Sequence, residues 1–291
     1  MTNSNYYSVP SISQMEEWAR VQTELKSKLI ETDDLKFTKT IKEENGEQIV
    51  EFDELSYIGG VDLSFENNEE NAIASLIVLK YPSLEVIYEN FSSVKLSLPY
   101  IAGFLAFREV TPLLDLLRNL KKTNPDIFPQ VIIVDGNGTL HPRRFGLASH
   151  LGVLANVPTI GVGKNFLQID DGENLTMAHV KMAVKEKLKK GGDTYLLQGQ
   201  SGVIWGAVCI KKRAQIYLRL INFIFYFLKA VRSLDNTTNP IFVSVGHRIS
   251  LDTSIQIVLK CCRYRIPEPT RQADIRSREF IRNHTSDQSV Q

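Results

Sequence analysis

Four carboxylates stand where they could hold a metal ion for hydrolysis. Asp135 directly follows the apolar run Val131–Val134, and a glycine-broken loop with a histidine and two arginines comes next. Asp62 lies near the end of another strand-like run, while Glu109 and Asp274 lie in helix-like segments. Carboxylates fixed by adjacent strands and helices can bind one or two Mg²⁺ ions that activate water for phosphodiester hydrolysis. Spacing alone leaves open whether the four converge, and a solvated aspartate opening a turn is the alternative for Asp135.

Several other residue types suit chemistry on a nucleic acid. Lys164, just after a strand-like run, could neutralise a scissile phosphate, although a surface lysine could occupy the same position. His141 could orient water or contact a phosphate, or it could be an ordinary hydrogen-bonding loop residue. Arg143 and Arg144 form a local basic patch that suits phosphates. Tyr100, on a glycine-adjacent loop, could wedge between bases, with a buried core tyrosine as the alternative.

The composition disfavours some other classes of protein. The 34 basic residues balance the 33 acidic ones, so nucleic-acid binding would need a local patch. The three cysteines form no CxxC pair and no zinc set, which fits a reducing compartment. The loop glycines match neither GxGxxG nor a P-loop, which disfavours an enzyme that uses a nucleotide cofactor. The polar first residues lack the pattern of a secretory signal, so we expect none.

The apolar patterning predicts a mixed order of strands and helices. The predicted strands, of which the first three read as an antiparallel meander, are Tyr57–Leu63, Ala72–Leu79, Glu85–Phe91, Val131–Val134, Thr159–Val162, Val203–Val208 and Ile241–Val245. The predicted helices are Ser11–Ile30, Gly103–Lys121, Gly146–Leu154, Met177–Lys190, Leu251–Arg263 and Thr270–Asn283. Asp33–Glu54 reads as a charged connector, and the tail 284–291 as disordered. A meander followed by alternating strands and helices favours an α/β fold, a mixed sheet flanked by helices.

Five segments resemble the successive motifs of the endonuclease V family: GGVDLSF, PYIAGFLAFRE, VDGNGTLHPRRFGLASHLGVLANVPTIGVGK, SVGHRISL and YRIPEPTRQADIRSRE. They cover most of Tyr57 to Arg282 in the family's order and resemble the animal branch more than the bacterial one. The resemblance implies one domain over residues 1–291, with a core of about 11–283 and a ribonuclease H-like fold. It also implies a dependence on Mg²⁺, with Mn²⁺ as an alternative ion.

The resemblance assigns roles to individual residues. The family's catalytic acids fall on Asp62, Glu109, Asp135 and Asp274, the first three of them as metal ligands. The catalytic set also includes the phosphate-contacting Lys164 and, in our interpretation, His141. The wedge falls on Tyr100, and the substrate-binding set continues with Gly103, Leu105, Gly136, Arg143 and Gly146. The family flips a deaminated purine into a pocket lined by backbone, and small residues let the backbone approach the base closely.

The family cuts the second phosphodiester bond on the 3′ side of inosine and leaves a 3′-hydroxyl and a 5′-phosphate. Bacterial members act on deoxyinosine in DNA, whereas animal members prefer inosine in single-stranded RNA. The leading expectation is therefore a magnesium-dependent endoribonuclease. A DNA-repair endonuclease acting at deoxyinosine and a catalytically silent RNA-binding module are the alternatives. We also expect a monomer that does not bind membranes, in the cytoplasm with a nuclear or nucleolar pool.

Two departures from the family's pattern stand out. The wedge usually reads PYIP, and Ala102 here replaces the second proline, which we expect to loosen the loop without changing the chemistry. The family also runs almost directly from a WGA strand to the SVGH strand. Here residues 208–230 intervene as an atypical insertion, dominated by Ile, Phe, Tyr, Leu, Lys and Asn.

We interpret the insertion as a retained intron translated in frame. Back-translated, Val208-Cys209-Ile210 can begin GTATGTAT, which resembles a splice donor, and the far end can be a pyrimidine-rich acceptor. The alternative is a genuine amphipathic or membrane-touching helix, but the apolar run is too interrupted for a spanning helix of about 20 residues. Sequencing the transcript across this segment tests the interpretation, and a dominant message that encodes the full insertion would contradict it.

Overall fold

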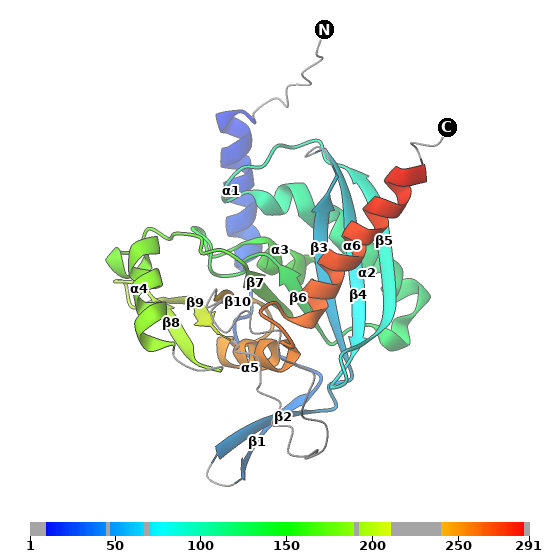
Figure 1. Cartoon of the computed structure of the whole chain (residues 1–291). Helices are drawn as coiled ribbons and strands as arrows, with labels where there is room; N and C mark the ends of the chain where they lie inside the picture. Colours follow the sequence, from blue (N-terminus) through cyan, green and yellow to red (C-terminus); the bar gives the residue numbers. More distant parts are fainter. Residues whose placement is uncertain (1–9, 45–46, 67–69, 189–191, 211–239, 288–291) are drawn as a thin grey trace, which may run out of the picture.

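The computed structural model describes residues 10–44, 47–66, 70–188, 192–210 and 240–287. Within them, one mixed sheet has the strand order β5-β4-β3-β6-β7-β10-β9-β8 (Figure 1). Its strands are β3 (Tyr57–Phe65), β4 (Asn71–Lys80), β5 (Glu85–Lys95), β6 (Val131–Asp135), β7 (Thr159–Gly163), β8 (Thr194–Gln198), β9 (Ile204–Cys209) and β10 (Ile241–His247). Strand β6 runs parallel to β3 and β7, and the other neighbours pair antiparallel. The predicted meander is therefore confirmed as β3, β4 and β5.

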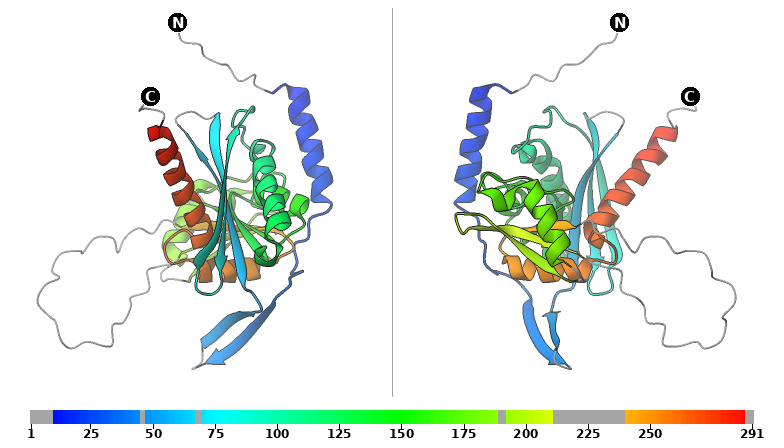
Figure 2. Two further views of the ribbon diagram at one scale, coloured as in Figure 1. Left: turned by 90° about the vertical axis from the view of Figure 1, so that its right-hand side faces the viewer. Right: turned by 60° about the vertical axis from the view of Figure 1, so that its left-hand side comes forward.

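Helices cover both faces of this sheet. They are α1 (Ile12–Lys26), α2 (Leu105–Thr123), α3 (Leu147–Ala155), α4 (Met177–Lys187), α5 (Leu251–Cys261) and α6 (Glu268–Asp287), with short 3₁₀ turns η1 (Pro125–Ile127) and η2 (Glu173–Leu175). Figure 2 (left) shows the sheet edge-on, with α6 on one side and α2 on the other. Strand side chains alternate between the faces, so Val61 joins the cluster under α2 and α3 while Ile58 joins the cluster under α5 and α6. The predicted fold class, a mixed sheet flanked by helices, is confirmed.

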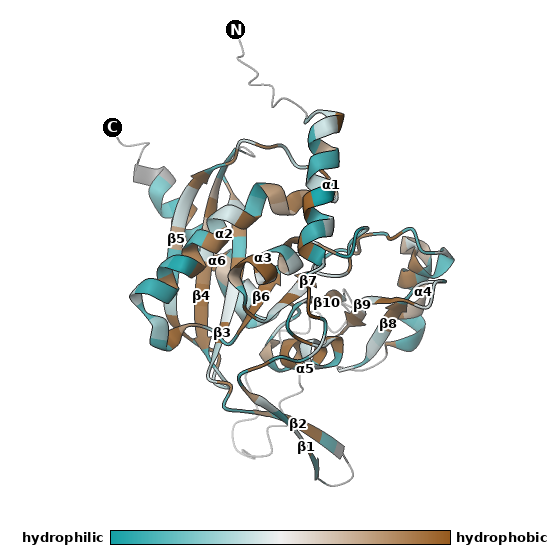
Figure 3. Ribbon diagram, turned by 180° about the vertical axis from the view of Figure 1, so that it is seen from behind, coloured by the Kyte–Doolittle hydropathy of each residue, from teal (hydrophilic) through white to brown (hydrophobic). Residues whose placement is uncertain are grey.

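The hydropathy of the chain follows these layers. The middle strands of the sheet are largely hydrophobic, while the outward side of α2 is largely hydrophilic (Figure 3). A third apolar cluster, which includes Leu197, Trp205 and Phe242, packs α4 against the far end of the sheet. No helix in the described ranges is both long enough and apolar enough to cross a membrane.

The prediction of a charged connector is wrong for the segment Asp33–Glu54. It contains an antiparallel hairpin of β1 (Thr38–Glu44) and β2 (Glu47–Asp53). Phe37 and Phe52, in edge-to-face contact with ring centroids 5.9 Å apart, anchor its base in the core. An exposed two-stranded ribbon buries little surface, so its strands carry charges where a sheet strand would alternate apolar and polar residues. That is why the pattern did not predict it.

Three other segments differ from the predictions. Strand β8 was not predicted, because its mostly exposed sequence TYLLQ lies at the edge of the sheet. Helix α6 begins before Thr270 and continues to Asp287, so residues 284–287 are helical and not a disordered tail. Val208 and Cys209, the first residues of the predicted insertion, complete β9 and pair with β10. The rest of the insertion from residue 211, and the tail from residue 288, lie outside the described residues.

Candidate active site

Two of the four carboxylates meet on neighbouring parallel strands. Val61 of β3 pairs with Val134 of β6, so Asp62 and Asp135, one residue further along each strand, share the face that α6 covers. Asp62 is buried, with 8% of its surface exposed. Burial raises its pKa to about 7, and the neighbouring negative charge of Asp135 adds to that effect.

Lys164 reaches the same place from the next strand. Asp135 pairs with Val162 of β7, and Lys164 lies two residues further on, so it faces the same way. Its Nζ lies 2.5 Å from Asp135 Oδ2. Burial alone would lower the pKa of Lys164, but the charge of Asp135 and its hydrogen bond outweigh that effect and raise it. The lysine is therefore a fixed positive charge beside the acids.

Asp274 approaches from α6, which crosses β3 closely. A Cβ at Gly60 would lie 2.1 Å from the carbonyl oxygen of Pro269, so only glycine permits this approach. The hydroxyls of Ser64 and Ser277 lie 2.7 Å apart and join the same two elements. Asp274 accepts a 2.7 Å bond from Arg278 Nε, four residues further along the helix, and its charge contributes to the raised pKa of Asp62. Arg278 was missed in the sequence, although its i,i+4 spacing from Asp274 is a readable signal.

Glu109 comes from α2, on the opposite layer. It is buried, and desolvation raises its pKa to about 8, with further contributions from the charges of Asp62 and Asp135. The charge of the adjacent Arg108 acts in the other direction. Three strands and two helices from both layers thus bring the four carboxylates and Lys164 into one cluster of interacting charges.

The donor chemistry of this cluster suits a divalent cation. Among the described residues, no three His, Cys, Asp or Glu side chains are close enough to hold one ion as they stand. Two of the acids are instead paired with Lys164 and Arg278. Burial is the first cause of the raised pKa values of Asp62 and Glu109, and the excess of negative charge from neighbouring carboxylates adds to it. A cation would offset that excess, and an all-oxygen donor set suits Mg²⁺ or Mn²⁺.

The predicted wedge and one wall of the predicted base pocket lie in the loop between β5 and α2. Tyr100 is 59% exposed, which rules out the alternative of a core tyrosine. The next residues form a turn in which the Phe104 N–H donates to the Ile101 carbonyl at 2.9 Å. Gly103 has φ +80°, a conformation that favours glycine. Leu105 then begins α2, whose first turn has no side-chain cap.

The second wall is the loop after β6, where glycine is also required. A Cβ at Gly146 would lie 2.4 Å from the carbonyl oxygen of Asn137. The Gly146 N–H donates to the Gly138 carbonyl at 2.9 Å, which folds the end of this loop back towards Gly136 at its start. Both predicted walls are therefore tight backbone turns.

The side chains of His141, Arg143 and Arg144 contact this loop region and its neighbours and not the carboxylate cluster. His141 accepts the Arg143 N–H at Nδ1, so its Nε2 donates to the Gly103 carbonyl at 3.0 Å. Burial lowers its pKa to about 4 and keeps it neutral. The Arg144 guanidinium lies 2.6 Å from Glu31. The structure therefore does not bring His141 to the acids. Arg143 and Arg144, the predicted basic patch, make contacts within the protein.

Two residues of α1 that the sequence did not single out contact this region. Gln22 is buried and hydrogen-bonds to Gly103, Arg143 and Phe145. Trp18 lies one turn earlier on the same helix and stacks on the ring of Phe107, 5.1 Å between centroids. Gln22 lies four residues after Trp18 on the same face of the predicted helix, and this i,i+4 spacing was the available signal for both.

We expect replacement of Ala102 by proline to stabilise the protein. Ala102 is the second residue of the Ile101–Phe104 turn, and the third residue, Gly103, has a positive φ. The turn therefore resembles type II, which favours proline at its second position. The free energy of unfolding should rise by about 0.4–1 kcal/mol, because proline restricts the unfolded chain. Denaturant titration measures this, with Ala102→Gly as the matched control that should lower stability. A lower stability for Ala102→Pro would show that the turn has another geometry.

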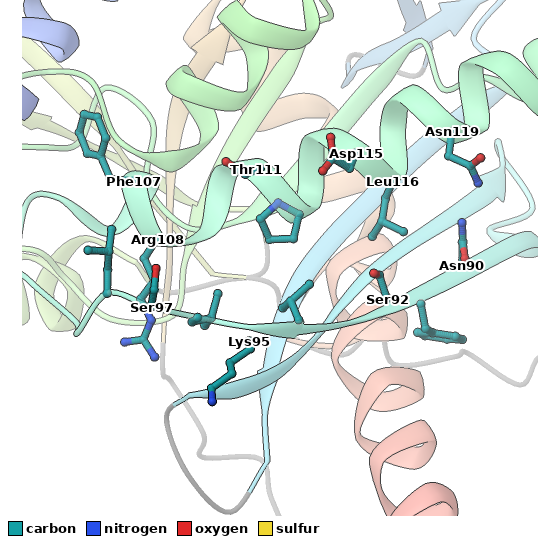
Figure 4. Close-up of a pocket in the computed structure, with 15 residues that line it drawn as sticks. Asn90, Ser92, Lys95, Ser97, Phe107, Arg108, Thr111, Asp115, Leu116 and Asn119 are labelled. Carbon is teal, nitrogen blue, oxygen red and sulfur yellow. The ribbon is translucent and has the colours of Figure 1, made fainter. Parts of the chain in front are cut away.

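A groove of about 620 Å³ lies between β5 and α2 (Figure 4). Its lining mixes polar and apolar residues and includes Ser92 and Lys95 from β5 and Arg108 from α2. None of the four carboxylates lines it. Arg108 lies over the ring of Phe65, 5.0 Å from its centroid, while its neighbour Glu109 belongs to the cluster. The candidate active site is therefore separate from this groove.

Comparison with known proteins gives matches over most of the chain. The family model described as Endonuclease V matches residues 36–275. Endonuclease V of Mus musculus is 44% identical over 266 residues, which are 91% of this chain and 69% of the mouse protein. The Homo sapiens protein is 42% identical over 266 residues, which are 91% of this chain and 82% of the human protein.

Solved structures agree with these matches. The crystal structure of the catalytic domain of human Endonuclease V is similar with a TM-score of 0.76 at 39% identity, covering 95% of this chain and 99% of that one. A Ciona intestinalis Endonuclease V, in complex with a 23mer DNA containing an inosine followed by a ribo-adenosine, has a TM-score of 0.76 at 33% identity. That match covers 94% of this chain and 99% of the Ciona chain.

Proposed function

This chain belongs to the endonuclease V family of nucleases, which act on phosphodiester bonds, and we propose that it cleaves single-stranded RNA at inosine. The cut is made at the second phosphodiester bond on the 3′ side, leaving a 3′-hydroxyl and a 5′-phosphate, and requires Mg²⁺ or Mn²⁺. The observation that carries this proposal is the coupled cluster of Asp62, Glu109, Asp135, Asp274 and Lys164.

The residues of the cluster fall into different roles in the proposed reaction. Asp62, Asp135 and Glu109 would hold the metal, which when bound supplies an activated water and stabilises the leaving oxygen. Asp62 and Glu109 must first lose their protons, because the ionised carboxylate and not the neutral acid is the metal ligand. Lys164 provides the positive charge that a phosphate beside Asp135 requires. Arg278 orients Asp274 from the next turn of α6.

The loops beside the cluster support recognition of an extruded base. The exposed Tyr100 is available to stack in the space that a flipped nucleotide vacates. Gly103, Leu105, Gly136 and Gly146 supply backbone that can come close to a purine edge. Hypoxanthine, which lacks the 2-amino group of guanine, suits a pocket of closely approaching backbone.

RNA is favoured over DNA for two reasons. Among the relatives compared, the mammalian ones are more similar to this chain than the bacterial ones, at 44% and 42% identity against 34–38%. The animal branch of the family is the one expected to prefer RNA. The Ciona neighbour binds a strand in which a ribonucleotide directly follows inosine, and a 2′-hydroxyl at that position distinguishes RNA from DNA. Deoxyinosine DNA is the second candidate substrate.

With Mg²⁺, the purified chain should cleave single-stranded RNA that contains one inosine. The 5′ product should end one nucleotide beyond inosine. The same RNA with adenosine or guanosine should stay intact, and matched deoxyinosine DNA should be cut more slowly. Product mapping on a sequencing gel measures the position. Faster cleavage of the DNA would move the function to DNA repair. A chain that binds inosine RNA without cutting it would be the silent module, and the version lacking residues 211–230 would then be compared.

A further inference from the structure

A single side-chain amide on α1 connects the two loops that form the proposed base pocket. Gln22 is 1% exposed. Its Nε2 donates to the carbonyl of Gly103 at 3.2 Å and to the carbonyl of Phe145 at 3.1 Å. Its Oε1 accepts from Arg143 Nε at 2.5 Å. The first carbonyl belongs to the turn before α2, and the second immediately precedes Gly146, so the amide bridges both walls.

The Gly103 carbonyl is a point of convergence. It accepts hydrogen bonds from Gln22, from His141 Nε2 at 3.0 Å and from the Arg143 guanidinium. The same guanidinium lies over the ring of Phe104, 4.1 Å from its centroid. Three donors, one from α1 and two from the loop after β6, thus hold one peptide group of the turn. The rigidity that proline would give at position 102 is here supplied by side chains.

Helix α1 is anchored independently of these bonds. Trp18 stacks on Phe107 with an interplanar angle of 13° and lies 5.6 Å from the ring of Phe104. Figure 1 shows α1 standing beside the loops at the start of α2 and α3. The family model matches residues 36–275, so α1, at Ile12–Lys26, lies outside the matched segment.

We infer that Gln22 is a positioning residue that sets the separation of the two backbone walls of the base pocket and thereby the selectivity for hypoxanthine. Hydrogen bonds to a base edge act over about 2.7–3.2 Å, so a small change in wall separation loses contacts to the base. Asp62 and Asp135 are held by the register of the sheet strands and not by this amide. This inference rests on the proposed function, because it requires that the two loops bind the base.

The test compares Gln22→Leu with Gln14→Leu, the same replacement at an exposed position of α1. Gln22→Leu should raise KM for inosine RNA by about 10-fold or more and reduce the preference for inosine over adenosine. Its kcat and the Mg²⁺ concentration for half-maximal activity should stay within about two-fold of the parent values. Gln14→Leu should match the parent protein in all four quantities.

A second variant keeps the test decisive if Gln22→Leu does not fold. Gln22→Glu retains an acceptor for Arg143 but cannot donate to the two carbonyls, so it should show the same rise in KM. An unchanged KM in a folded variant, or an equal fall in kcat on every substrate, would overturn the positioning role. The parent protein is assayed alongside, and its inactivity on inosine in both RNA and DNA would reject the proposed function together with this inference. If the parent protein is active and the Gln22 variant has the same KM, only the inference about Gln22 is rejected.

Discussion

Replacement of Asp135 by alanine should abolish cleavage, with kcat/KM for inosine RNA falling by about 10³-fold or more. Asp135 is central to the cluster, because it contacts Lys164 at 2.5 Å and its charge acts on both Asp62 and Glu109. Metal-dependent catalysis contributes several kcal/mol to lowering the barrier, and about 1.4 kcal/mol corresponds to a factor of ten in rate. Binding of RNA should persist, since the loop contacts that hold the base are unchanged.

Single-turnover cleavage gives the rate in this experiment, and fluorescence anisotropy of labelled RNA gives the affinity. Asp126→Ala, at an exposed position in η1, is the matched control and should leave both unchanged. Retained cleavage by Asp135→Ala would reject the assignment of the metal site. Loss of RNA binding together with cleavage would point to a folding defect, which thermal unfolding would reveal.

Replacement of Glu109 by glutamine should have opposite effects on activity and on stability. Activity should fall by about 10²-fold or more, because a neutral amide is a weaker metal ligand than a carboxylate. The metal-free protein should become more stable, because burial and two negative neighbours raise the pKa of Glu109 to about 8. Between the ordinary glutamate pKa of about 4.3 and that value, the folded state holds a proton that the unfolded state has released, so stability is lost as pH rises.

Glutamine does not titrate, so the stability advantage of the variant should grow with pH across this window and level off above about pH 8. Each pKa unit corresponds to about 1.4 kcal/mol, so the gain should reach a few kcal/mol in the absence of metal. Thermal unfolding of both proteins in EDTA at about pH 5, 7 and 9 measures it. Saturating Mg²⁺ should shrink the difference, because the ion stabilises the carboxylate. A constant difference at all pH values would mean that Glu109 is not a buried acid.

Local patterns in the sequence predicted seven of the eight strands of the central sheet, the covering helices and the candidate acids. Strands such as Val131–Val134 are buried on both faces, so their apolar runs are continuous and end where Asp135 begins. The glycines of the recognition loops were also readable, because tight backbone approach leaves few alternatives to glycine. The resemblance to the family rested on these same segments, which carry both the fold and the chemistry.

Only the tertiary structure decided how these pieces meet. Asp62 and Asp135 become neighbours through strand register, and Glu109 reaches them across the sheet from the other layer. Gln22 contacts Gly103 and Phe145 across more than eighty residues of chain. No residue near these positions in the sequence encodes such contacts, because they depend on how distant elements pack. The exposed hairpin β1–β2 was not predicted, because it buries too little surface for its sequence to show a regular alternation of apolar and polar residues. The sequence by itself therefore determined which groups could do chemistry. Packing between distant elements decided that the acids share one site and that α1 contacts the loops beside it.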